Sequence, residues 1–138
     1  MSSPFSPAPV TSSENRRMPR SPFERLQKIC LALPEAHEQL AWNEPTFRVK
    51  NKMFAMYANA NNHHGGGRHA VWVKASIENQ RLLVTQHPDR LFIPPYVGPS
   101  GWIGVWLDKK PDWKAVSELI TDAYLRVAPK KLAEQIRT

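Results

Sequence analysis

Apolar residues recur at helical spacing in two stretches of the chain. The first begins at Ser21, which can cap a helix with Pro22 in its first turn and Glu24 three residues after the cap. The apolar stripe that follows consists of Phe23, Leu26, Ile29, Cys30 and Leu33. This pattern predicts a helix that buries one face and ends before Pro34.

The second helical stripe is the strongest in the chain and follows Asp112, a residue that can cap a helix. Its apolar positions are Val116, Leu119, Ile120, Ala123, Tyr124 and Val127. Pro129 ends the stripe, and a short basic helix is predicted over residues 130–137. A less apolar helix is predicted from the cap residue Ser76 to about residue 86, with packing positions at Leu82 and Leu83.

Elsewhere the period of the pattern changes from helical to alternating. Strands are predicted over residues 37–42, 46–50, 53–58, 69–74, 91–93 and 102–108. The step from Lys50 to Lys52 predicts a tight hairpin, and residues 43–45 predict a turn. The predicted fold class is therefore α+β: an antiparallel sheet of about five to six strands with helices packed on one face.

The length of 138 residues suits a single domain. Residues 1–20 are rich in Ser, Pro and Arg and predict a disordered N-terminal arm, so the domain is expected over residues 21–138. No apolar run approaches the roughly 20 residues that a membrane-spanning helix requires. A single cysteine, Cys30, cannot form an internal disulfide, and we expect a cytoplasmic monomer.

Five short segments of the chain resemble the MmcQ/YjbR family, small bacterial proteins whose fold is similar to that of the frataxin homologue CyaY. The matching segments are Ile29 to Glu35, Lys52 to Ala55, Val73-Lys74 with Gly101-Trp102, and Ala123 to Val127. The resemblance extends over residues 23–137, although residues 59–68 and 94–101 depart from the family pattern. The resemblance implies an antiparallel sheet with helices on one face. It also implies a probable DNA-binding protein.

A candidate nucleic-acid site follows from the strand pattern together with the formal net charge of +7, which attracts anionic partners. If the apolar strand positions face the helices, the opposite, open face presents Arg48, Lys50, Trp72, Lys74, Trp102 and Trp106. Lys52, Lys109 and Lys110 would widen this area from adjoining turns. Because cations track phosphates and flat rings stack on bases, we expect mostly sequence-independent DNA binding.

Two alternatives stay open for this face. The tryptophans could cover the sheet or pack beneath loops, with the stems of Lys and Arg lying around them. The face could also serve a protein-interaction or small-ligand-binding domain that meets an apolar or acidic partner. A steep dependence of binding on salt distinguishes contact with nucleic acid from these alternatives.

The sequence gives little support for metal, phosphate-loop or catalytic chemistry. His63, His64 and His69 invite a metal site, but no carboxylate or cysteine lies near them, so a solvated hairpin tip is favoured. Residues 65–67 are glycines without the Lys-Ser/Thr pair of a phosphate loop. The acidic ridge with which frataxins are thought to bind iron is missing from the first helix. We therefore expect no cofactor, no metal and no enzymatic activity.

Overall fold

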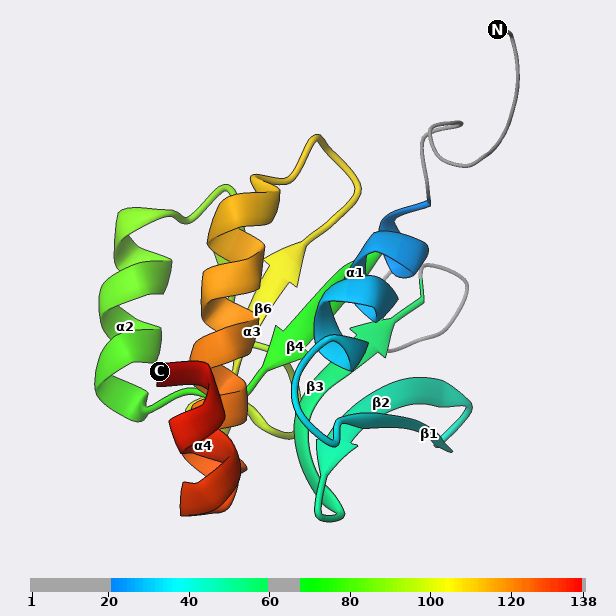
Figure 1. Ribbon diagram of the computed structural model, residues 1–138. Coiled ribbons are helices and arrows are strands. Elements are labelled where there is room, and N and C mark those ends of the chain that lie inside the picture. Colours follow the sequence, from blue (N-terminus) through cyan, green and yellow to red (C-terminus); the bar gives the residue numbers. More distant parts are fainter. Residues whose placement is uncertain (1–20, 60–67, 138) are drawn as a thin grey trace, which may run out of the picture.

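The computed structural model describes residues 21–59 and 68–137 and contains a six-stranded sheet with helices packed on one side of it (Figure 1). The elements are α1 (Pro22–Leu31), β1 (His37–Ala41), β2 (Glu44–Val49), β3 (Lys52–Ala58), β4 (Ala70–Val73), α2 (Ile77–Gln86), β5 (Leu91–Phe92), β6 (Ile103–Trp106), α3 (Trp113–Val127) and α4 (Lys130–Arg137). The α+β prediction is confirmed. The predicted arm and residues 60–67, which belong to the segment that departs from the family pattern, lie outside the described residues.

The strands lie in the order β1-β2-β3-β4-β6-β5, and all neighbours are antiparallel. The predicted hairpin joins β2 to β3, and its two turn residues, Lys50 and Asn51, both have positive φ. Tight two-residue hairpins need that conformation because it matches the twist of the strands. Trp42 and Asn43 form a similar turn, so β2 begins at Glu44, two residues earlier than predicted.

Side-chain caps fix where three of the helices begin. The Ser21 hydroxyl accepts from the Glu24 amide while the Glu24 carboxylate accepts from the Ser21 amide, both at 3.1 Å. Ser76 caps α2, and the Asp112 carboxylate accepts from the first free amides of α3. All three caps were predicted, because a cap needs only a short polar side chain next to the amides that it satisfies.

The main core lies between the sheet and the helices α1 and α3. The apolar strand positions that were predicted to face the helices are all buried there: Phe47, Val49, Val71, Val73, Ile103, Val105 and Leu107. Tyr124 of α3 is fully buried, and its hydroxyl donates to the Pro34 carbonyl at 2.7 Å. In α1, burial raises the pKa of the Cys30 thiol, and the nearby charge of Glu38 adds to the effect. No helix in the described ranges is long and apolar enough to cross a membrane.

The packing of α2 differs from the prediction. Leu83 packs against the main core as predicted, but Leu82 is 55% exposed, and Gln80, which was not predicted to pack, is buried. The Gln80 amide donates to the carbonyls of Gly98 and Trp102, at 2.9 and 2.7 Å. The helix therefore turns a polar residue inward, because that residue holds the loop that leads into β6.

Candidate nucleic-acid interface

The strand positions that alternate with the core form the helix-free face of the sheet. Arg48 in β2, Trp72 in β4 and Trp106 in β6 occupy such positions, as predicted from the alternation. Much of this face is nevertheless covered. A second cluster, here called the aromatic cluster, consists of buried Met56, Ala58, Ala70, Trp72 and Trp102, with Met53, Phe92, Val97 and Trp106 packed against it.

Two of the predicted stacking residues are inside the aromatic cluster. Trp72 is 2% exposed and Trp102 is 5% exposed, so the prediction that they present open rings is wrong. The reason is that the large rings bury one another. Phe92 lies across Gly104, where a Cβ atom would overlap the Phe92 ring, so the absence of a side chain lets the aromatic layer close over β6.

Trp106, the third predicted stacking residue, is half-buried and already in contact with other flat groups. The Phe92 ring stacks on it with centroids 4.0 Å apart, and the Arg68 guanidinium lies 3.8 Å from its ring centre. Arg68 is held in turn by the Asp108 carboxylate, at 2.7 and 3.0 Å. This hydrogen bond holds the pKa of Asp108 below its usual range. The ring surface that a base would use is thus largely occupied.

Four of the predicted cations, in contrast, lie in or beside the β2–β3 hairpin, at one end of the sheet. Arg48 lies opposite Met53 in the register of β2 and β3. The Lys74 amide donates to the Phe54 carbonyl, which places Lys74 beside the start of β3, and its ammonium lies 5.9 Å from the Trp102 ring centre. The β2–β3 hairpin at this same end carries Lys50 and Lys52. These four cations are called the hairpin-end cations below: Arg48, Lys50, Lys52 and Lys74.

The hairpin-end cations differ in how exposed their side chains are and in whether another side chain already binds their charged groups. Lys52 is exposed, and no described side chain pairs with it. Lys74 is half-buried, and Lys50 forms a surface ion pair with Glu35 at 2.8 Å. Such exposed pairs are worth only about 0 to 1 kcal/mol, so a phosphate can compete for Lys50. The half-buried Arg48 donates to the Thr46 hydroxyl at 3.0 Å, a contact that orients its guanidinium.

Two other cations do not join this group. Lys109 and Lys110 follow β6 at the end where Trp106 pairs with Ala70, whereas Lys74 follows the opposite end of β4. The prediction that they widen the same charged area is therefore wrong. The site prediction also did not include Trp42, whose side chain is 74% exposed in the β1–β2 turn. Trp42 directly precedes Asn43, a residue typical of turns, and this was the signal, since a large side chain at a hairpin tip has little to pack against.

The histidine prediction can be followed only in part. His63, His64 and the glycines 65–67 lie outside the described residues. His69 is engaged with another side chain: its Nδ1 atom is hydrogen-bonded to the Tyr57 hydroxyl, and its ring stacks on the Tyr57 ring. Within residues 21–59 and 68–137 no three His, Cys, Asp or Glu side chains lie close enough together to hold a metal ion.

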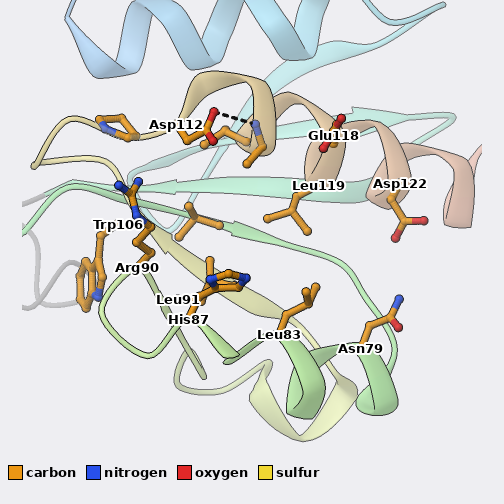
Figure 2. Close-up of a pocket in the computed structure, with 14 residues that line it drawn as sticks. Asn79, Leu83, His87, Arg90, Leu91, Trp106, Asp112, Glu118, Leu119 and Asp122 are labelled. Atoms are coloured by element: carbon orange, nitrogen blue, oxygen red, sulfur yellow. Dashed lines mark hydrogen bonds between the residues drawn. The ribbon is translucent and has the colours of Figure 1, made fainter. Parts of the chain in front are cut away.

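A groove on the other side of the sheet was not predicted. It lies between α2 and α3, has a volume of about 480 Å³ and is floored by β5 and β6 (Figure 2). Its lining is mainly apolar, with Arg90 and Trp106 at one end and Asn79 and Asp122 at the other. The sequence carried no signal for it, because the groove depends on the spacing of two helices.

Comparison with known proteins shows the family of this chain. The YjbR family model matches residues 31–126. The chain belongs to the YjbR family. The crystal structure of the Deinococcus radiodurans protein DR2400, which carries the DUF419 domain, resembles it with a TM-score of 0.66 at 20% sequence identity, over 83% of this chain and 87% of that one. This likeness shows the shared fold, and no curated protein matches the sequence. The family resemblance drawn from the sequence is thereby confirmed.

Proposed function

We propose that this YjbR-family protein binds DNA through its hairpin-end cations, largely without regard to base sequence, and that it acts by binding rather than by catalysis. The observation that supports the proposal is that Arg48, Lys50, Lys52 and Lys74 all lie in or beside the β2–β3 hairpin, at one end of the sheet. A net charge of +7 adds long-range attraction for a polyanion.

The form of the contact follows from what the site offers. Lysine ammonium groups and the Arg48 guanidinium pair with phosphate oxygens, which are the same for every base. Because Trp72 and Trp102 are buried, base stacking on them has no part in the proposal. Binding should therefore be driven by release of counterions from the duplex. It should be weak at physiological salt and should show little preference between sequences.

A titration by fluorescence anisotropy tests the proposal with a short labelled duplex at several salt concentrations. If all four hairpin-end cations contact phosphates, the logarithm of the binding constant should fall with the logarithm of salt with a slope of about −3 to −4. Replacing Lys52 and Lys74 together by Ala should reduce that slope by about two.

A matched control removes the same charge elsewhere. Lys109 and Lys110 are exposed and follow β6 at the end where Trp106 pairs with Ala70, opposite to the end of β4 that Lys74 follows, and replacing both by Gln removes the same charge. We expect this control to leave the slope nearly unchanged. Equal losses in the two double variants would show that only net charge matters, and the hairpin end would then not be the site. Failure of the wild-type protein to bind at low salt would contradict the proposal as a whole.

A further inference from the structure

We propose that Glu35 lowers the affinity of the hairpin end for DNA, because its carboxylate occupies the Lys50 ammonium until a phosphate group displaces it. The inference rests on the proposed DNA binding and identifies a residue that opposes that binding. Glu35 Oε1 lies 2.8 Å from Lys50 Nζ. Within residues 21–59 and 68–137 no other carboxylate forms an ion pair with a hairpin-end cation. Glu35 is therefore the protein's own competitor for the phosphates of DNA at this end of the sheet.

The turn between α1 and β1 brings Glu35 to the hairpin, although the two lie apart in the sequence. His37, two residues after Glu35, lies opposite Arg48 in the register of β1 and β2. Arg48 is in turn opposite Met53, close to the two residues that turn β2 into β3. The turn therefore runs beside the same end of the sheet that carries the hairpin-end cations.

The backbone of this turn is fixed by the core and not by the ion pair. The Tyr124 side chain is fully buried, and its hydroxyl donates to the Pro34 carbonyl at 2.7 Å. Glu35 itself has a φ of 56°, a left-handed conformation that is uncommon for a residue of its kind. Since Tyr124 holds the peptide next to this residue, the carboxylate stays within reach of Lys50 whether or not the two side chains are paired.

The carboxylate and a phosphate compete for the same hydrogen-bond donors. The Lys50 ammonium has three N–H groups and no other charged partner among the described residues. Both side chains of the pair are 56% exposed, so the ammonium can exchange one oxygen partner for another while it stays in contact with water. An exposed pair is weak enough to be displaced, but its loss must be offset each time DNA binds.

The test measures the affinity of the full chain for the labelled duplex by fluorescence anisotropy at one low salt concentration. Glu35→Gln keeps the size of the side chain and removes its charge. It should tighten binding about two- to fivefold, the range that an exposed ion pair implies. Glu118 is exposed and lines the groove between α2 and α3, so Glu118→Gln makes the same change in net charge away from the hairpin. This control should change the affinity by less than about 1.5-fold.

Repeating Glu35→Gln in a Lys50→Gln background separates occupation of Lys50 from simple repulsion of DNA. Without the ammonium there is nothing to occupy, so the gain should fall below about 1.5-fold. An equal gain in both backgrounds would show that Glu35 only repels phosphates, and the proposal would be overturned. It would also be overturned if wild type binds DNA and Glu35→Gln binds no more tightly than Glu118→Gln. Failure of wild type to bind at low salt would instead contradict the proposed function, and this inference would fall with it.

Discussion

Replacing Gln80 by Leu should destabilise the protein although it puts an apolar side chain of similar size into a buried place. Gln80 lies in α2, and its amide donates to two carbonyls of the segment that leads into β6. The Gly98 carbonyl also accepts from the Gly101 amide and keeps that partner in the variant. The Trp102 carbonyl loses the Gln80 amide, and Trp102 is itself part of the aromatic cluster.

The cost can be estimated from these contacts. An orphaned buried carbonyl costs about 1 to 3 kcal/mol, and a second lost hydrogen bond about 0.5 to 1.5 kcal/mol. Burying the extra apolar surface of Leu returns roughly 1 kcal/mol, so the net loss should be about 0.5 to 3.5 kcal/mol. Urea unfolding followed by circular dichroism measures it, and Gln86→Leu, at an exposed position of the same helix, should change stability by less than about 0.5 kcal/mol. A loss for Gln80→Leu as small as that of the control would refute the role assigned to this amide.

Two further predictions concern titratable groups. Native Cys30 is buried with a raised pKa, so DTNB at about pH 8 should modify it at least about a hundredfold more slowly than in urea-unfolded protein, and similar rates would contradict its burial. The Arg68 guanidinium lowers the pKa of Asp108, so this pair adds stability above the ordinary carboxyl pKa of about 4 that is lost as the pH falls through the lower native value. Asp108→Asn should therefore cost about 0.5 to 1 kcal/mol near neutral pH, with a difference from wild type that shrinks between about pH 5 and pH 3, and a difference that does not change with pH would count against the pair.

The elements of the fold could be predicted because their signals are local. Ser21, Ser76 and Asp112 cap helices through atoms within three residues of themselves. The bounds of α4 were predicted as they occur, since Pro129 marks its start. The alternation in β4 and β6 correctly separated core positions from the helix-free face.

What lies on the helix-free face could not be predicted from the same alternation. A period of two separates the faces of a strand, but it does not say whether the second face meets water or other rings. Trp72 and Trp102 are buried because Phe92 of β5 and Val97 of the loop after it pack against their cluster. Gln80 was missed for a similar reason, since its two carbonyl partners lie 18 and 22 residues further along the chain.

The most direct measurement of the central claim is an NMR titration of the protein with duplex DNA at low salt, because it locates the contact residue by residue. We expect the largest amide shifts at the β2–β3 hairpin, around Lys50 and Lys52, and at Lys74. The indole N–H signals of the buried Trp72 and Trp102 should stay nearly in place. Large shifts of those two indoles, or amide shifts that avoid the hairpin, would contradict binding through the hairpin-end cations.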